Sequence, residues 1–141
     1  MSTTKIHIRT NGEKFYSITD QVRSQLPNLL RDQKQQSGIL YLFVMHTSCA
    51  LLITESYDPS AQEDMEAFLQ YLAPRNLPFI RHTLEGPDDS PSHMKSLLLH
   101  QNLAILVEEG EMVMGRWQGL FLAEFREEPK NRSILLKFLA G

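Results

Sequence analysis

The feature that most constrains this chain is an uninterrupted apolar run from Ile39 to Met45. A run without a polar position favours a central strand that is covered on both faces, rather than a strand with one wet side. Its seven residues are far fewer than the roughly 18 that a membrane span requires. The chain is therefore expected to fold around a β-sheet, to be soluble and to have no membrane partner.

Short alternating segments surround that run and predict further strands. Residues 5–10 and 14–18 flank Asn11-Gly12, a pair typical of tight turns, so the chain is expected to open with a β-hairpin. Further strands are expected over residues 50–54, 103–107, 118–126 and 133–139. These patterns predict an α+β fold with a mostly antiparallel β-sheet or sandwich, in a single domain over residues 1–141.

Two to three helices complete the predicted fold. The first is expected to be capped by Thr19 or Asp20 and to kink or split at Pro27. Asp58-Pro59 and Ser90-Pro91 each place a capping side chain before a proline, which is typical of a helix start. The positions expected to face the core are Met65, Phe68, Leu69 and Leu72 in the second helix and Met94, Leu97 and Leu98 in the third.

Charge and cysteine content exclude several classes of protein. There are 17 Asp and Glu residues against 14 Lys and Arg, without the basic cluster that binds a phosphate backbone, so no nucleic-acid partner is expected. The N-terminal segment lacks the apolar core of a secretory signal, so a cytoplasmic location is expected. The single cysteine, Cys49, excludes an internal disulfide and a multi-thiolate zinc site. Any metal would have to be held mainly by histidines and carboxylates.

The densest polar cluster lies between residues 81 and 95, largely within a proline-rich stretch from Pro74 to Pro91. Within these 15 residues the chain has two imidazoles, three carboxylates and the ammonium of Lys95, enough to hold a divalent metal and to pair with phosphate. The spacing of His82 and His93 matches no usual zinc pattern, and composition alone favours a solvated loop whose carboxylates complement a helix N-terminus. Both interpretations stay open at this point.

Further candidates lie at strand ends. His46 ends the apolar run, where binding sites often gather, although a histidine satisfied within the core fits equally well. Cys49 could form a nucleophile pair with His46, but positions 46 and 49 of an extended chain point to opposite faces. A small apolar core residue is therefore the simpler interpretation of Cys49. Glu55 is a candidate general base or ligand. In the segment 114–119, Arg116 could clamp a phosphate or a carboxylate, while a β-bulge around a packed tryptophan is the simpler interpretation.

Five blocks of residues, in order along the chain, resemble the YjbQ family, a group described as secondary thiamine-phosphate synthase enzymes. The blocks are His46-Thr47-Ser48 with Ala50-Leu51, Glu55 with Asp58-Pro59 and Asp64, His82 with Glu85-Gly86 and Asp88-Asp89, Pro91-Ser92-His93 with Lys95, and Gly115 with Trp117-Gln118-Gly119. The resemblance covers nearly the whole chain. It implies a compact α+β subunit that forms a homotrimer, with a polar site near the subunit boundaries.

The resemblance also implies a chemistry. It implies a weak transferase activity that joins a pyrimidine pyrophosphate to a thiazole phosphate, releasing pyrophosphate and giving thiamine phosphate, while the main reaction of the family is unsettled. A divalent metal, zinc or magnesium, is the expected cofactor, held by His82 and His93. The residues expected to be catalytic are His46, Glu55, Asp89 and Lys95, and those expected to bind the phosphorylated substrate are Ser48, Arg116, Trp117, Gln118 and Gly119.

This chain departs from the family pattern at three positions. The family usually has Glu-His-Arg where this chain has Glu124-Phe125-Arg126, so an imidazole that could serve as a metal ligand is absent. Thr54 replaces a usual amide residue, and Arg116 replaces a usual threonine. Two hypotheses follow. One is a metal-dependent enzyme in which Lys95 and Arg116 hold phosphate oxygens, and the other is a non-catalytic trimeric ligand-binding or structural module with a degenerate site.

Overall fold

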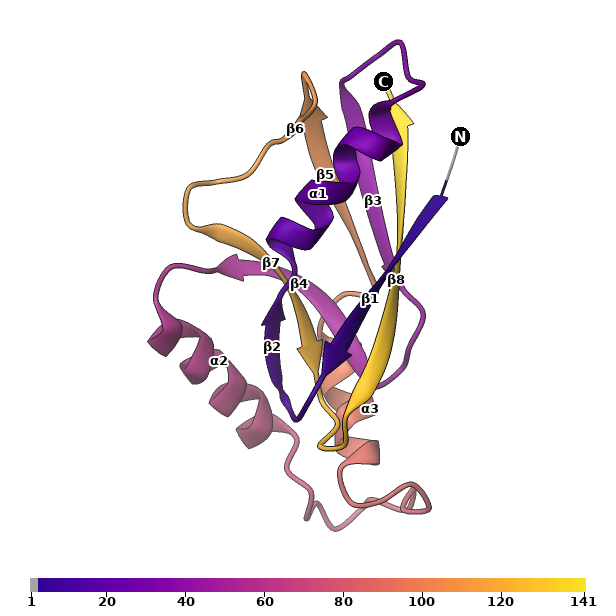
Figure 1. The fold of residues 1–141 in the computed structure, drawn as a ribbon. Coiled ribbons are helices and arrows are strands. Elements are labelled where there is room, and N and C mark those ends of the chain that lie inside the picture. Colours follow the sequence, from indigo (N-terminus) through magenta and orange to yellow (C-terminus); the bar gives the residue numbers. More distant parts are fainter. Residues whose placement is uncertain (1–2) are drawn as a thin grey trace.

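The computed structural model describes residues 3–141, in which eight strands form two antiparallel sheets (Figure 1). The five-stranded sheet has the order β1 (Thr3–Thr10), β8 (Lys130–Ala140), β3 (Gly38–Val44), β5 (Asn102–Glu108) and β6 (Glu111–Met112). The three-stranded sheet has the order β2 (Lys14–Ser17), β7 (Gln118–Glu124) and β4 (Cys49–Glu55). The helices are α1 (Thr19–Leu30), α2 (Pro59–Leu72) and α3 (Asp89–Leu98).

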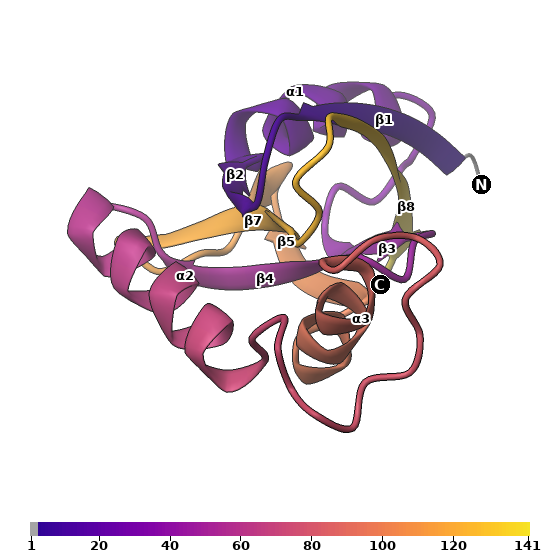
Figure 2. The ribbon, with the colours of Figure 1, turned by 90° about the horizontal axis from the view of Figure 1, so that it is seen from below.

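The two sheets curl into a half-barrel and, with α1, enclose the main hydrophobic core (Figure 2). Buried members of this core include Val22, Leu40, Leu42, Val107, Leu120, Leu122, Ile134 and Leu136. A smaller cluster lies on the other face of the three-stranded sheet, toward α2, and contains Phe15, Ala50, Leu52, Leu69, Phe121, Ala123 and Phe125. The fold is therefore α+β with mostly antiparallel strands, as the sequence predicts.

The apolar run of the sequence forms a central strand, but only one of its faces is covered. β3 lies between β8 and β5, and its alternate residues Leu40 and Leu42 are buried in the core. The intervening side chains of Ile39, Tyr41 and Phe43 are 38–42% exposed, because the described helices pack elsewhere. The expectation that both faces are covered is thus wrong for the described chain. We call these three positions, with Leu106 and Leu139, the outer sheet face.

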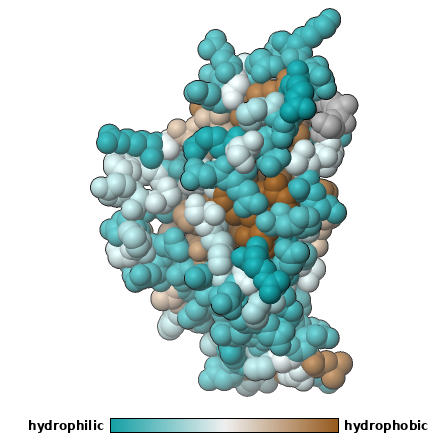
Figure 3. Space-filling view, viewed as in Figure 1, coloured by the Kyte–Doolittle hydropathy of each residue, from teal (hydrophilic) through white to brown (hydrophobic). Residues whose placement is uncertain are grey.

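The surface around α1 differs in character from the outer sheet face. It is largely hydrophilic, with a hydrophobic strip along its middle (Figure 3).

Within residues 3–141, none of the helices has the length and apolar character needed to cross a membrane.

The predicted opening hairpin does not form, because its two strands join different sheets. β1 pairs with β8 from Thr3 to Thr10, whereas β2 pairs with β7. The expected turn is present, with Gly12 at a φ of 97°, and the Tyr16 hydroxyl ties it by accepting from the Asn11 N–H (2.7 Å) and donating to the Gly12 carbonyl (2.9 Å). The chain therefore passes from one sheet to the other at this turn.

The first helix is continuous and has no side-chain cap. The hydroxyl of Thr19, a predicted cap, instead accepts from the Leu120 N–H (2.8 Å) and donates to the Leu120 carbonyl (3.4 Å), which fixes the start of α1 to β7. Pro27 lies inside the helix, which runs to Leu30, so the expected split does not occur.

The second helix begins at the predicted residue, but fewer of its side chains face the core than the sequence predicts. Asp58 caps α2 by accepting from the Ser60 N–H at 2.9 Å, with proline at the first helical position. Leu69 is buried, whereas Phe68 and Leu72 are exposed, because only one edge of α2 reaches the smaller cluster.

The third helix turns its polar face inward, which reverses the prediction. It begins at Asp89 rather than after Ser90, and Leu97 and Leu98 are 70% and 53% exposed. The buried side chains are Asp89, Pro91, Ser92, Lys95 and Ser96. This orientation is tolerated because the charged side chains on that face find ion-pair partners across the fold. A helix that buries charge is typical of a functional site rather than of a plain core.

A buried ion pair joins β7 to β8 at the end of the half-barrel next to α3. The Arg132 guanidinium donates to both carboxylate oxygens of Glu124, at 2.8 and 2.5 Å, and to the Ser48 hydroxyl at 2.8 Å. Glu124 also accepts from the Thr10 hydroxyl and from the backbone N–H groups of the next two residues, Phe125 and Arg126. Since Glu124 is completely buried, every one of these bonds compensates the loss of water.

Substitution of this carboxylate should strongly destabilise the fold. Glu124→Gln keeps the shape of the side chain but leaves the Arg132 cation buried without a counter-ion, so we expect a loss of about 3–5 kcal/mol in the free energy of unfolding, measured in urea. Glu128→Gln is the matched control, because Glu128 lies on the surface and pairs loosely with Lys130 at 3.7 Å. A Glu124→Gln variant as stable as this control would contradict the account.

Candidate metal centre

Three potential metal ligands converge where the long loop between α2 and α3 meets the start of α3. The Nε2 of His82, from the loop, lies 2.8 Å from Oδ2 of Asp89, and the Nε2 of His93 lies 3.1 Å from the same oxygen. All three ligand atoms lie within 4.8 Å of one another. Asp89 and His93 are one helical turn apart on α3, so the helix itself sets their spacing. We call these three side chains the His-Asp-His cluster.

The hydrogen bond of His93 fixes the state of its ring. Its Nδ1 lies 2.8 Å from the Thr47 carbonyl, which can only accept, so Nδ1 carries a hydrogen. In a neutral ring, Nε2 then presents a lone pair to the Asp89 oxygen 3.1 Å away. Two facing lone pairs need either a proton or a metal ion between them. The donor set and this geometry therefore fit a divalent cation.

Arg126 orients both acidic residues at the start of α3. Its guanidinium donates to Asp89 Oδ1 (2.6 Å), to Asp88 Oδ2 (3.0 Å) and to the Glu85 carbonyl (2.9 Å). Burial alone would raise the pKa of Asp89, but the hydrogen bond from His82 and the positive charges nearby outweigh burial and lower that pKa. Asp89 is therefore ionised at neutral pH, with Oδ1 occupied by Arg126 and Oδ2 facing the two imidazoles.

These contacts resemble the supporting shell of a metal site. A ligating histidine usually donates its other ring N–H to a carbonyl or carboxylate, as His93 does to Thr47, and a ligating carboxylate is usually hydrogen-bonded, as Asp89 is to Arg126. Two imidazole nitrogens and one carboxylate oxygen suit zinc and related divalent ions, and three protein ligands leave a coordination position for substrate or water.

A hollow of about 650 Å³ adjoins the cluster. It is lined by His46, Thr47, His82, His93, Ser96, Leu97 and Gln101. Among the described residues this lining includes no Asp, Glu, Lys or Arg side chain, so its own hydrogen-bonding groups are neutral apart from the histidines. The hollow is large enough for a small organic molecule.

His46 lies in this hollow as a neutral ring. Its Nε2 accepts from the Ser133 N–H at 2.9 Å, which leaves the hydrogen on Nδ1. Burial lowers the pKa of His46, and the positive charge of Arg132 lowers it further, although Glu124 opposes them. The structure thus brings together four sequence-predicted site residues, namely His46, His82, Asp89 and His93.

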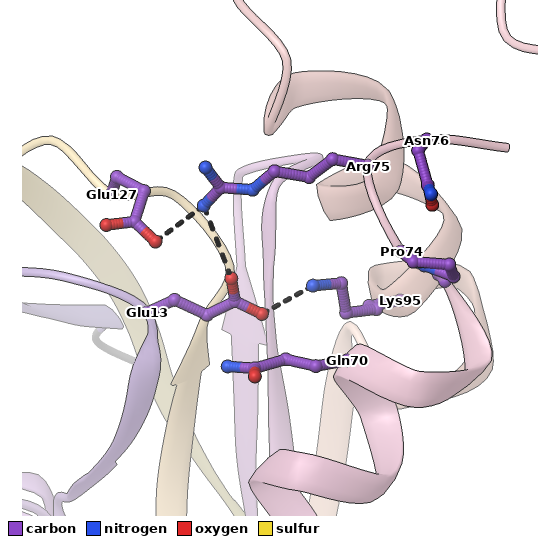
Figure 4. A pocket seen from close by; sticks show the side chains of 8 residues that line it. Glu13, Gln70, Pro74, Arg75, Asn76, Lys95 and Glu127 are labelled. Carbon is purple, nitrogen blue, oxygen red and sulfur yellow. Dashed lines mark hydrogen bonds and ion pairs between the residues drawn. The ribbon is translucent and has the colours of Figure 1, made fainter.

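Lys95 projects from the other side of α3 into a separate pocket (Figure 4). Its buried ammonium pairs with Glu13, while Arg75 lies 4.0 Å from Glu13 and 2.5 Å from Glu127. The structure therefore places Lys95 in an ion network of its own, away from the lining of the hollow.

Phe125 packs on the same side as Lys95. The Lys95 ammonium lies 5.6 Å from the centre of the Phe125 ring, which belongs to the smaller hydrophobic cluster. The next residue, Arg126, donates to Asp89. The consecutive side chains of Phe125 and Arg126 therefore contact opposite sides of α3, Phe125 at Lys95 and Arg126 at Asp89. A histidine at position 125 with this orientation would face Lys95 rather than complete the His-Asp-His cluster.

Most of the expected substrate-binding residues lie at the far end of β4. Glu55 pairs with Gln118, whereas Cys49 pairs with Glu124 near the cluster. These two residues are the ends of the seven-residue strand β4 and therefore lie about 20 Å apart. At this end, the rings of Trp117 and Tyr57 pack edge to face, with their centres 4.7 Å apart. The Arg116 guanidinium lies over the Trp117 ring, 4.7 Å from its centre.

Gly119 and Ser48 have structural contacts that explain their residue types. A Cβ at Gly119 would lie 2.6 Å from that of Ser56, so only glycine fits this close approach of strands. The Ser48 hydroxyl accepts from Arg132 at 2.8 Å and is buried.

Cys49 is a core residue, in agreement with the simpler interpretation. It is completely buried, and burial raises the pKa of its thiol to about 12. Such a thiol is not ionised at neutral pH and does not act as a nucleophile.

Sequence reasoning missed several polar residues that contribute to this region, including Arg126, Ser96 and Gln101. Arg126, which orients Asp89, lies just after β7, 37 residues further along the chain. Ser96 lines the hollow from the predicted third helix. Ser96 lies seven residues after Asp89 and three after His93, a helical spacing that places all three on one face of the helix, so the sequence could have indicated Ser96 as a site residue.

The fold and site define a small α+β half-barrel protein with a candidate metal centre at one end. A family model described as UPF0047 protein YjbQ-like matches residues 4–141. The chain is 37% identical over 121 residues to UPF0047 protein YjbQ of Escherichia coli O157:H7, covering 86% of this chain and 85% of that protein. It is 35% identical over 136 residues to UPF0047 protein MJ1081 of Methanocaldococcus jannaschii, covering 96% of this chain and 92% of that protein. The chain belongs to the YjbQ/UPF0047 family.

A solved structure supports the same assignment. The conserved hypothetical protein TT1486 of Thermus thermophilus superposes with a TM-score of 0.83 at 39% sequence identity, covering 96% of this chain and 99% of that one. The predicted family is thus confirmed at the level of both sequence and fold.

The state of His46 can be measured directly. We expect ¹⁵N-resolved NMR of the imidazoles to show a neutral ring with hydrogen on Nδ1, protonated only below the ordinary pKa of 6.5. Because the unfolded chain takes up that proton more readily, the stabilisation from His46 is present above about pH 6.5 and is lost as the pH falls toward the pKa of the folded state. A ring that is charged at pH 7, or that carries its hydrogen on Nε2, would contradict this assignment.

Proposed function

We propose that the His-Asp-His cluster binds a divalent metal ion and that the chain is a metal-dependent enzyme acting on phosphorylated small molecules. The observation that carries the proposal is the convergence of three ligand atoms within 4.8 Å, with the Asp89 carboxylate held by Arg126 and the His93 ring held by Thr47. A surface cluster of polar side chains has no need for such supporting contacts.

A bound divalent ion would neutralise negative charge on phosphate oxygens and polarise the phosphoryl group. The chain's own residues would mainly position the reactants. Arg126 keeps the Asp89 carboxylate turned toward the two imidazoles, and the hollow beside the cluster supplies a partly enclosed space for the substrate. Phosphoryl chemistry needs little more from a protein than such positioning and charge stabilisation.

Family membership supports a finer version of this proposal. In this version the chain is an enzyme with a weak transferase activity that forms thiamine phosphate as a secondary reaction, and its location, proposed from the N-terminal sequence, is the cytoplasm. In that reaction the metal would favour departure of pyrophosphate, which is consistent with a site rich in oxygen and imidazole ligands. The physiological substrate would be another phosphorylated compound.

A non-catalytic module is the competing proposal, and the observation that favours it is that both cations expected to hold phosphate are engaged: Lys95 pairs with Glu13, and Arg116 stacks on Trp117. Phe125 also replaces the family's usual histidine, but it packs beside Lys95 and not at the cluster. A module of this kind would retain the fold and ligand binding but show no turnover.

Metal uptake distinguishes an intact cluster from a degenerate one. We expect wild-type protein to bind one Zn²⁺ or Mn²⁺ per chain in a calorimetric titration, and His82→Ala and His93→Ala each to weaken binding at least about 100-fold, because each removes a ligand. Binding should also weaken between pH 7.5 and 5.5, because protons compete with the metal for imidazole.

His100→Ala is the matched control, because it removes an exposed histidine outside the cluster. Equal metal affinity in all variants, or no uptake by wild type, would refute the metal site. Stoichiometric metal without turnover of any phosphorylated compound would favour the binding module.

We also propose that three copies of the chain assemble through the outer sheet face. Five large apolar side chains are exposed there on adjacent strands, and a contiguous apolar face is typical of a subunit interface. A second copy would cover the side of β3 that the described helices leave open.

Sedimentation velocity tests this assembly. We expect wild type to sediment as three 16.2 kDa chains and Phe43→Glu as one, because the new charge would be buried without a partner at the interface. Tyr71→Glu, which alters an 82%-exposed ring on α2, should leave the trimer intact. A monomeric wild type, or a Phe43→Glu trimer, would refute the proposal.

A further inference from the structure

Ser96 carries a buried hydroxyl whose hydrogen-bonding capacity is not used. The residue is only 3% exposed, and its Oγ finds no hydrogen-bond partner within residues 3–141. A serine in a helix commonly donates to a backbone carbonyl of the preceding turn, as Ser92 does to Asp89. An unpaired buried hydroxyl costs stability, so its presence in this position calls for a ligand that it serves.

The position of Ser96 relative to the His-Asp-His cluster is set by α3. Asp89, His93 and Ser96 follow one another at intervals of four and three residues, so they lie in a row along one face of the helix. Ser96 and His93 both line the hollow. A molecule that contacts the cluster and extends along α3 would therefore meet Ser96 next.

Two neutral donors are available to such a molecule. One is the Oγ–H of Ser96, and the other is the Nδ1–H of His46, since the Nε2 of that ring is occupied by the Ser133 N–H. Neither donor brings a charge, and the described lining contains no carboxylate that would repel an anion. Neutral donors beside a divalent cation form a suitable environment for an oxyanion.

The cationic side chains that the sequence suggested for phosphate are engaged elsewhere. Lys95 is paired with Glu13 in the pocket of Figure 4, and Arg116 stacks on Trp117 at the far end of β4. Within the described chain, the hollow must therefore recognise an anion by a metal and neutral donors.

We infer that Ser96 and His46 are the phosphate-positioning residues of the hollow. The Oγ–H of Ser96 and the Nδ1–H of His46 donate to oxygens of a phosphate group whose remaining oxygen contacts the cation at the His-Asp-His cluster. The organic part of the phosphate ester lies against Leu97, which is apolar and 70% exposed at the rim. This inference rests on the proposed function, because the bound cation supplies the positive charge that the lining lacks.

If Ser96 positions phosphate, the variant Ser96→Ala should keep or gain thermal stability while its affinity for phosphate falls. Ser96→Ala removes a hydroxyl without a partner, so the Tm of the variant should equal or exceed that of wild type. The same change removes a donor to phosphate, so phosphate binding should weaken. A serine that merely supported the fold would lower the Tm when substituted.

The experiment is a calorimetric titration of inorganic phosphate, and then of phenyl phosphate, into Mn²⁺-loaded protein at pH 7. For Ser96→Ala we expect about tenfold weaker phosphate binding and unchanged Mn²⁺ affinity, because a hydrogen bond to a charged acceptor is lost while the cluster is intact. His46→Gln should weaken phosphate in the same direction. Phenyl phosphate should bind more tightly than phosphate in wild type, through contact with Leu97.

Ser24→Ala on α1 is the matched control, since its hydroxyl bonds the Gln21 carbonyl far from the site. Protein that binds Mn²⁺ but has the same phosphate affinity with and without the Ser96 hydroxyl would overturn the inference and leave the proposed metal site standing. Protein that takes up no Mn²⁺ would overturn the proposed function and this inference together.

Discussion

The buried ion pair between Glu124 and Arg132 is the interaction on which the rest of the site depends. Arg132 joins the Glu124 carboxylate to Ser48, next to the Thr47 carbonyl that holds the His93 ring. The same carboxylate accepts from the Arg126 N–H and so fixes the turn from which Arg126 reaches Asp89. The Thr47 carbonyl that holds His93 and the Arg126 guanidinium that holds Asp89 are therefore both positioned next to the buried Glu124–Arg132 pair. Such a pair costs desolvation energy, and its many hydrogen bonds offset that cost.

This arrangement explains why α3 turns its polar face inward. A helix that packed Leu97 and Leu98 against the sheet would bury more apolar surface, yet it would leave the Arg126 guanidinium without acidic partners. In the observed orientation, Arg126 is satisfied and Asp89 is presented to the two imidazoles. The fold thus gives up some apolar burial for an electrostatic framework, which is a common feature of functional sites.

The fold class, most strands and the cap of α2 could be predicted from local patterns, because alternation and capping depend on near neighbours in the sequence. The hairpin prediction failed because β1 and β2 each pair with a strand more than 100 residues away, which no local signal encodes. His82 and His93 were recognised as metal-ligand candidates by residue type, and the predicted family is confirmed. The place of Arg126 and the engagement of Lys95 by Glu13 were not accessible, because both are long-range ion pairs.

The central claim is that the Glu124–Arg132 framework holds His82, Asp89 and His93 in a geometry ready for a cation. Anomalous diffraction from crystals soaked in Zn²⁺ tests it most directly. The account predicts one strong peak at about 2.0–2.2 Å from the Nε2 atoms of both histidines and from Oδ2 of Asp89, with Arg126 still on Oδ1. Crystals whose anomalous peaks lie only elsewhere, with the contacts between Asp89 Oδ2 and the Nε2 atoms of both histidines unchanged, would contradict it.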